Sequence, residues 1–146
     1  MAHTYHKLWI HLIWSTKDRA PLLVREMRGD LLAHIRETAP EKGIHLDALN
    51  GTADHLHGLV SLSPEQSIAR VVNDLKGESS HWVNAQRRLS IPFAWERGYS
   101  AFSYAESQVP KVREYIRNQE THHRKMTFQE ELTQFLKRFH VDEGRP

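Results

Sequence analysis

Two histidines two positions apart, His55 and His57, are the residues of this sequence best suited to chemistry. They open a short run, residues 55–62, whose apolar residues and preceding turn predict a β-strand. Side chains at positions i and i+2 project from the same face of a strand, so the two imidazoles can converge on one metal ion. A pair of surface histidines on a half-exposed strand has the same spacing. The metal interpretation therefore needs a third ligand and a reactive group nearby.

Both are present in the stretch from Tyr115 to Gln119. Positions i and i+4 of a helix share a face, which places the Tyr115 hydroxyl beside the Gln119 amide. Tyr115 is then the candidate nucleophile and Gln119 the third metal ligand. The alternative for Tyr115 is an aromatic residue that packs in the core and has no chemical role.

The composition agrees with a metal site and excludes several other kinds of centre. There are 11 histidines among 146 residues, and histidine is the side chain best suited to bind metals near neutral pH. The absence of cysteine excludes disulfides, cysteine nucleophiles and thiolate metal sites. A formal net charge of +2 permits a phosphate-bearing partner but does not identify one.

Length and hydropathy predict a single domain over residues 1–146, with residues 141–146 as a flexible tail. No apolar run approaches the roughly 20 residues that cross a bilayer, so no membrane association is expected. The N-terminal residues lack the layout of a secretory signal, and we expect a cytoplasmic protein.

The elements that must position these residues can be predicted from the spacing of apolar residues, which alternates along the chain between the period of a strand and that of a helix. It predicts the order β-α-β-β-α-β-α-α and hence an α/β (α+β) fold of the ferredoxin-like kind, a mainly antiparallel sheet with helices packed on one face. His11, in the first strand, is expected to be a hydrogen-bonded histidine of the sheet and not a ligand. Ser63 and Pro64 are expected to begin the second helix as N-cap and first residue. The predicted strands cover residues 5–14, 44–50, 55–62 and 93–104, and the predicted helices cover 25–42, 64–89, 110–119 and 128–139.

Several separate blocks of the sequence resemble the HUH nucleases, and specifically the IS200/IS605-type single-tyrosine (Y1) transposases. That family pairs a His-hydrophobic-His strand with one catalytic tyrosine on a helix. One departure is Glu96, where glutamine is expected in close relatives. The blocks are His6 to Arg19, Asp54 to His57, Lys76 to Ser80, Trp95 to Ser103, and Tyr115 to His123.

The resemblance implies a transposase that cleaves and rejoins single-stranded or hairpin DNA at insertion-sequence ends. Tyr115 would form a 5′-phosphotyrosine, and a divalent ion held by His55, His57 and Gln119 would bind the scissile phosphate. Mg²⁺ or Mn²⁺ is the expected ion, although the two ring nitrogens would also accept Zn²⁺, Co²⁺ or Ni²⁺. The family further implies a homodimer with trans active sites, in which the histidine pair of one subunit meets the tyrosine helix of the other.

Basic residues near these blocks are candidates for binding the DNA backbone. Most such charges lie on solvated helix faces in proteins of this composition, so the assignment is open for each of them. His122 and His123, seven and eight positions after Tyr115, are candidates for contact with phosphate or metal, and an ordinary surface role is the alternative for both. The DNA-binding candidates are Lys76, Arg97, Arg113, Arg117 and His122.

Two other functions fit parts of the pattern. A non-mobile, domesticated relative could keep the fold and act as a DNA- or RNA-binding regulator, which loss of the histidine pair, Gln119 or Tyr115 would favour; all four residues are present. A metal phosphodiesterase could use water as the nucleophile in place of tyrosine. A covalent protein-DNA adduct would exclude the phosphodiesterase.

Overall fold

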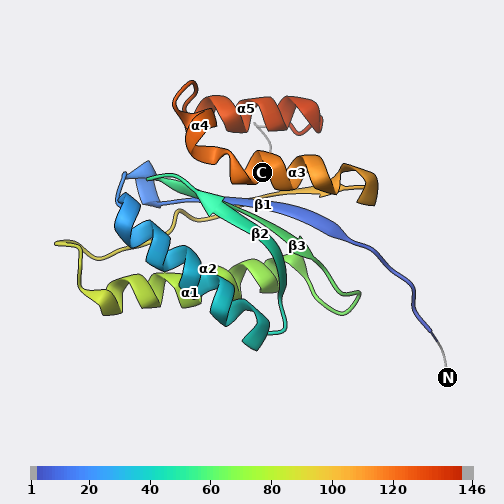
Figure 1. Ribbon diagram of the computed structural model, residues 1–146, viewed down its shortest axis with the longest axis horizontal. Helices are drawn as coiled ribbons and strands as arrows, with labels where there is room; N and C mark the ends of the chain where they lie inside the picture. The colour runs from blue at the N-terminus through green and yellow to red at the C-terminus, as the bar shows by residue number, and fades with distance from the viewer. Residues whose placement is uncertain (1–2, 143–146) are drawn as a thin grey trace.

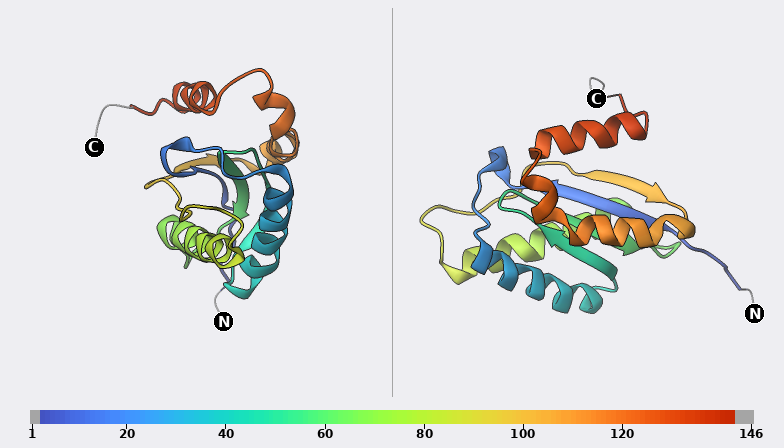
Figure 2. Two further views of the ribbon diagram at one scale, coloured as in Figure 1. Left: turned by 90° about the vertical axis from the view of Figure 1, so that its left-hand side faces the viewer. Right: turned by 45° about the horizontal axis from the view of Figure 1, so that its top comes forward.

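The computed structural model describes residues 3–142 and contains a four-stranded sheet between two layers of helices (Figures 1 and 2). The strand order is β2-β3-β1-β4, and each neighbouring pair is antiparallel. This is the ferredoxin-like arrangement expected from the sequence. The strands are β1 (Trp9–Ser15), β2 (His45–Gly51), β3 (His55–Ser61) and β4 (Ser100–Tyr104).

The central strand β1 is buried on both faces, because helices cover both sides of the sheet. Ile10, Leu12 and Trp14 point into the larger core, while Trp9 and Ile13 belong to two smaller clusters on the opposite face. The expectation that helices pack on one face was therefore wrong. The strand also begins four residues later than Tyr5, because the segment before Trp9 is exposed and has no strand partner for Tyr5.

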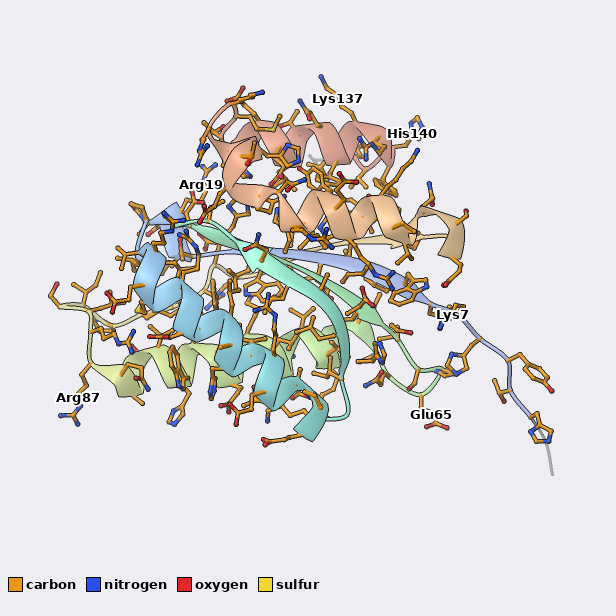
Figure 3. All side chains as sticks on the ribbon, in the orientation of Figure 1. Lys7, Arg19, Glu65, Arg87, Lys137 and His140 are labelled. Carbon is orange, nitrogen blue, oxygen red and sulfur yellow. The ribbon has the colours of Figure 1, made fainter. Side chains whose placement is uncertain are left out.

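One face of the sheet is covered by α1 (Arg25–Glu41) and α2 (Ile68–Gln86), which lie side by side below the sheet in Figure 1. The apolar stripes of both helices meet alternate residues of β1 and β3, and this forms the largest core of the molecule. Figure 3 shows Arg87 at the end of α2 and Lys137 near the end of the last helix, on opposite sides of the molecule.

Helix α2 begins at Ile68 and not at the predicted Pro64. Ser67 is its N-cap, and the Ser67 side chain accepts a hydrogen bond from the Arg70 backbone N–H. The capping contact expected at Ser63 exists in another form, since its N–H donates to Gln66 Oε1. Pro64 and Glu65 form a turn that precedes the helix. The prediction from capping residues therefore placed the helix start about one turn too early.

The other face carries α3 (Val109–Arg117), α4 (Gln119–His123) and α5 (Phe128–Arg138). The predicted single helix through Tyr115 and Gln119 is interrupted at Asn118, whose φ of −96° and ψ of 24° end α3. Helix α5 starts at a capping box in which Thr127 and Glu130 satisfy each other's backbone N–H. These three helices form the layer above the sheet in Figure 1.

A tight hairpin between β2 and β3 positions the histidine pair. A Cβ built on Gly51 would lie 2.4 Å from the His55 carbonyl oxygen and 2.4 Å from the Leu56 side chain, so only glycine fits there. The three residues Thr52 to Asp54 then return the chain into β3. His55 is therefore held at the first position of its strand by the backbone of the strand beside it.

The described residues contain two short 3-10 helices in addition to these elements, η1 (Lys17–Arg19) and η2 (Glu106–Gln108). Val141 and Asp142 have no regular structure, and residues 143–146 of the predicted tail lie outside the described residues. Among residues 3–142, no helix combines the length and the apolar character that a membrane span requires.

Candidate active site

The His55 and His57 side chains lie on the face of β3 that is covered by α3, α4 and α5, as their alternation with Leu56 predicts. Both are fully buried. Their strand pairs with β1 so that His55 lies opposite Ser15 and His57 opposite Ile13. The spacing argument for convergence of the two rings is confirmed, since their centroids are 5.1 Å apart.

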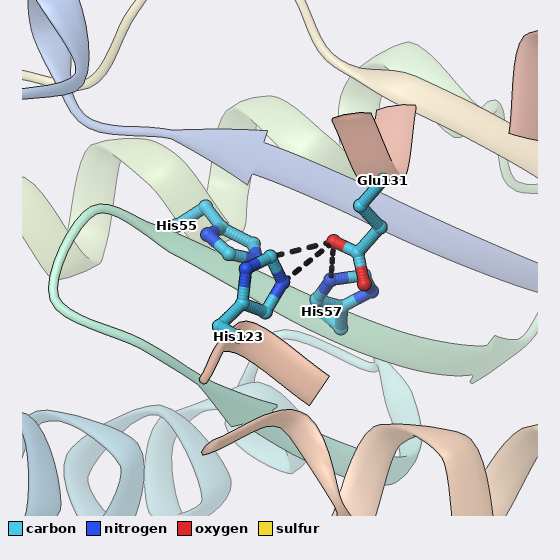
Figure 4. A group of neighbouring side chains, drawn as sticks. All are labelled: His55, His57, His123 and Glu131. Carbon is cyan, nitrogen blue, oxygen red and sulfur yellow. Dashed lines mark hydrogen bonds and ion pairs between the residues drawn. The ribbon is translucent and has the colours of Figure 1, made fainter. Parts of the chain in front are cut away.

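A carboxylate from α5 approaches both rings. Glu131 is 1% exposed, and its Oε1 atom lies 2.9 Å from His57 Nε2 and 3.3 Å from His55 Nε2. His123 Nε2, at the end of α4, lies 3.0 Å from the same oxygen (Figure 4). Four side chains from three elements thus surround one small volume.

The outer nitrogens of the histidine pair are held by further side chains. His55 Nδ1 lies 2.8 Å from Asp54 Oδ1 and 2.9 Å from Thr52 Oγ1. His57 Nδ1 lies 2.7 Å from Nε2 of the buried His11. These contacts fix both rings with Nε2 pointing at Glu131, the arrangement by which proteins orient histidine ligands. The prediction that His11 is a hydrogen-bonded sheet residue is confirmed for its Nε2 atom.

Tyr115 reaches the same centre from α3. Its hydroxyl donates a hydrogen bond to Glu131 Oε2, so one carboxylate contacts the tyrosine through one oxygen and the histidines through the other. His122 stacks on the Tyr115 ring, with the two centroids 4.6 Å apart. Tyr115 is neither a plain core residue nor a free surface residue, because its ring is half-buried and its oxygen is directed at the cluster.

Gln119 is fully buried directly after the helix break, and its Nε2 donates to the Tyr115 carbonyl oxygen at 3.3 Å. Its Oε1 has no hydrogen-bond partner among the described residues. The predicted proximity of Gln119 to Tyr115 is therefore present although the two residues lie on different helices.

Burial and the carboxylates set the protonation of the cluster. Burial lowers the pKa of His57 to about 4, and this ring stays neutral near pH 7. Burial also opposes ionisation of Glu131, but the hydrogen bonds from His123 and His57 and the adjacent His55 ring outweigh it and hold the pKa of this carboxyl well below its usual range. Burial and the adjacent Glu131 raise the pKa of Tyr115, which keeps the phenol protonated.

The residues present fit a divalent metal ion. The buried His55 Nε2 and Gln119 Oε1 atoms are electron-pair donors that have no hydrogen-bond partner among residues 3–142. Unpaired buried polar atoms are costly, and a bound cation would satisfy them. The neutral imidazole of His57 and the ionised Glu131 are also in the protonation states that metal ligands require.

The predicted DNA-binding residues are spread over several parts of the surface. Lys76 Nζ is engaged in holding the loop before β4, since it donates to the carbonyl oxygens of Glu96 and Gly98. Arg113 forms a two-point ion pair with Asp47. Arg97 and Arg117 are exposed. His122 alone among the five contacts Tyr115.

A cavity of about 470 Å³ lies beside Tyr115, between α3 and α5. Its lining combines aromatic rings with the cationic ends of two side chains, the combination that accepts a nucleotide base and its phosphate. The lining residues are His11, Tyr104, Ser107, Gln108, Lys111, Val112, Tyr115, Phe135 and Arg138.

Sequence reasoning missed Glu131. Its signal was present in the pattern: Glu131 lies three residues after Phe128 and four before Phe135, within the apolar stripe of α5. A charged residue on a buried helix face has a partner in nearly all proteins. That partner could not be named, because the histidine pair is more than 70 positions away in the sequence.

A sequence model described as IS200-like transposase matches residues 4–119. The chain is 29% identical over 119 residues to the ISDra2 transposase TnpA of Deinococcus radiodurans, covering 78% of this chain and 85% of that protein. It is 26% identical over 124 residues to the transposase for the IS200 element of Salmonella typhimurium, covering 82% and 81%.

Two solved structures have a similar fold. A Deinococcus radiodurans protein assigned as a transposase superposes with a TM-score of 0.67 at 31% identity, covering 82% of this chain and 95% of that one. A REP-associated tyrosine transposase bound to a REP hairpin gives a TM-score of 0.59 at 14% identity, covering 84% and 74%, a likeness of fold alone. Residues 120–142, which carry His123 and Glu131, follow the segment that the family model matches.

Proposed function

Because this chain belongs to the IS200-like transposase family, we propose that it cleaves and rejoins single-stranded DNA with Tyr115 as its nucleophile. The observation that carries the proposal is the shared contact of Glu131 with the Tyr115 hydroxyl and the histidine pair, which supports Tyr115 as the nucleophile of a centre in which the histidines would bind the metal. His55, His57 and Gln119 would hold Mg²⁺ or Mn²⁺. When bound, such an ion neutralises the charge that develops on the scissile phosphate.

The chemical step transfers the DNA strand to the protein. The Tyr115 oxygen bonds to phosphorus, the bond from phosphorus to the 3′ oxygen breaks, and the products are a 5′-phosphotyrosine and a 3′-hydroxyl end. The phenol must lose its proton in this step, because its raised pKa keeps it protonated beforehand. Glu131 accepts a hydrogen bond from this hydroxyl and is in reach to receive the proton, while the leaving 3′ oxygen takes one from solvent.

The same step can run in reverse to join strands. A phenol, with an ordinary pKa of about 10, is a better leaving group than a sugar alkoxide, so a 3′-hydroxyl can displace the tyrosine without ATP. The cavity beside Tyr115 supports a single-stranded or hairpin substrate, because an unpaired base can stack on its aromatic side chains without the cost of first leaving a duplex.

We place this chemistry in a homodimer with trans active sites. Helices α3, α4 and α5 follow β4 in the sequence and contact the sheet from one side, so the same layer could be supplied by a second copy of the chain. In the single chain described here, the Tyr115 ring lies 5.9 Å from the ring of its own His57. An exchange of this layer between subunits would preserve every contact of the site.

Tyr115→Phe tests the nucleophile. The substitution removes one oxygen and keeps the ring between His122 and Phe135, so folding and DNA binding should be retained while the adduct is lost completely. The measurement is a denaturing gel of protein mixed with an end-labelled hairpin DNA in Mn²⁺, with Tyr99→Phe, an exposed tyrosine, as the control. EDTA should also abolish the wild-type adduct. An adduct formed by Tyr115→Phe would assign the reaction to another residue.

A further inference from the structure

The histidine pair is part of a larger ligand set than the family pattern provides. His55, His57, His123 and Glu131 each direct one ligand atom into the same volume, and these atoms all lie within 4.8 Å of one another. Three of the four residues are fully buried and His123 is 11% exposed (Figure 4). Two of them lie beyond residue 119, where the family match ends.

The distances from Glu131 Oε1 to the three ring nitrogens are compatible with ligands around one ion. Zinc lies about 2.0 to 2.2 Å from nitrogen and oxygen ligands, which puts neighbouring ligand atoms roughly 3.0 to 3.5 Å apart. Glu131 Oε1 lies 2.9 Å from His57 Nε2, 3.0 Å from His123 Nε2 and 3.3 Å from His55 Nε2. Each separation is close to an edge of such a coordination polyhedron.

Hydrogen bonds alone do not satisfy the cluster. A single carboxylate oxygen has two lone pairs, whereas three ring nitrogens approach Glu131 Oε1. His57 and His123 hydrogen bond to it, and His55 Nε2 is buried with no hydrogen-bond partner among the described residues. One cation at the centre would use the lone pairs of all three nitrogens and of the carboxylate.

We propose that His55, His57, His123 and Glu131 form an alternative ligand set at the histidine pair, a four-ligand site for a late first-row divalent ion such as Zn²⁺ or Co²⁺. The inference rests on the proposed function for the role of the histidine pair as metal ligands. Three imidazoles and one carboxylate favour these ions over Mg²⁺, which prefers oxygen ligands and water. Because the two sets share His55 and His57, an ion bound by the four ligands excludes one bound with Gln119.

The four-ligand set also joins distant parts of the chain. His55 and His57 lie on β3, His123 ends α4 and Glu131 lies on α5. The loop between α4 and α5 contains the exposed residues Arg124 and Lys125. An ion bound by all four side chains therefore fastens α5 to the sheet across an exposed loop.

Titration of the full-length, metal-free protein with Co²⁺ tests the site, because four-coordinate Co²⁺ absorbs visible light far more strongly than six-coordinate Co²⁺. The wild type should bind one ion with the intense four-coordinate spectrum. Glu131→Gln and His123→Asn should each weaken Co²⁺ binding by about tenfold or more and reduce the spectrum to the weak six-coordinate form. Gln119→Ala should leave both unchanged.

Matched controls separate loss of a ligand from general damage. Glu130→Gln changes the exposed neighbour on the same helix and keeps an oxygen for the Thr127 N–H, and His122→Asn changes the histidine outside the cluster. Both should bind Co²⁺ as the wild type does. Circular dichroism in EDTA verifies that each variant is folded, and Zn²⁺ should slow trypsin cleavage after Arg124 and Lys125 in the wild type but not in Glu131→Gln.

Wild-type affinity and spectrum in Glu131→Gln would overturn the four-ligand site, as would a six-coordinate spectrum in the wild type. Neither result bears on the nucleophile, because the covalent adduct and its loss in Tyr115→Phe are measured separately. Conversely, Tyr115→Phe keeps all four ligands, so its Co²⁺ spectrum should be four-coordinate even if Tyr115 proved not to be the nucleophile.

Discussion

At the scale of single residues, the buried nitrogen atoms of the histidines decide which charges the site can hold. His11 lies behind His57 and packs against the Phe135 ring, with the two centroids 5.3 Å apart. Burial and the neighbouring His57 lower the pKa of His11 well below its ordinary value. The folded protein therefore keeps His11 neutral at a pH where the unfolded chain would protonate it.

His11→Phe should make the stability of the metal-free protein less dependent on pH. A lowered folded-state pKa means that the contribution of His11 is fully present above pH 6.5 and is lost as the pH falls toward the folded-state pKa. Between pH 6 and 5 the free energy of unfolding should fall less steeply in the variant, by up to about 1.4 kcal/mol per pH unit. Urea denaturation in EDTA at several pH values measures this slope. Equal slopes in both proteins would contradict the expected protonation of His11.

Sequence spacing identified only those site residues whose neighbours are close in the sequence. The i, i+2 period of a strand predicted that His55 and His57 share a face, and the i, i+4 period predicted that Gln119 lies near Tyr115. No local spacing in the sequence identifies the residues that Glu131 contacts. Its role follows from the way β1 and β3 bring α5 over the sheet, which is a property of the tertiary structure.

At the scale of elements, the hairpin of β2 and β3 fixes where the histidine pair begins. Gly51→Ala should destabilise the protein by about 1 to 3 kcal/mol, because the added Cβ would lie 2.4 Å from the His55 backbone oxygen. The same change at Gly77, in the middle of α2, meets nothing within 4 Å and should stabilise the helix by about 0.5 to 1 kcal/mol. Urea denaturation at pH 7 compares the two.

A stable Gly51→Ala variant would show that the hairpin can move, and the position of His55 would then depend on other contacts.

The order of the elements and the sheet itself were predictable from alternation and helical period. Their bounds were less so: Asn118 interrupts a helix whose apolar pattern continues past it. The packing of helices on the second face of the sheet was also missed. Both faces of β1 carry apolar or histidine side chains, and this pattern does not identify the elements that cover each face.

At the scale of the whole molecule, the proposed exchange of α3, α4 and α5 between subunits can be tested by mixing variants that are each expected to be inactive. Tyr115→Phe and His57→Ala subunits each lack one part of the centre, and a heterodimer with trans sites rebuilds one complete centre. Random mixing of equal amounts makes half of the dimers heterodimers, so the mixture should form roughly a quarter of the wild-type adduct. Each variant alone should form none. A mixture that forms no adduct would place Tyr115 and His57 of the working centre in the same chain.

The strand order also determines when the centre can form during synthesis. The strands β2 and β3 are joined by three residues and can pair as soon as they are made, whereas Trp9 of β1 waits for Tyr104 of β4. Loop closure over such a distance is slow, and this pairing should be among the last to form. Both imidazoles are thus present on a finished hairpin while Tyr115 has not yet been translated. A ribosome-bound chain that ends before residue 105 should already bind metal ions weakly, but it should form no covalent adduct with DNA because it lacks the proposed nucleophile Tyr115.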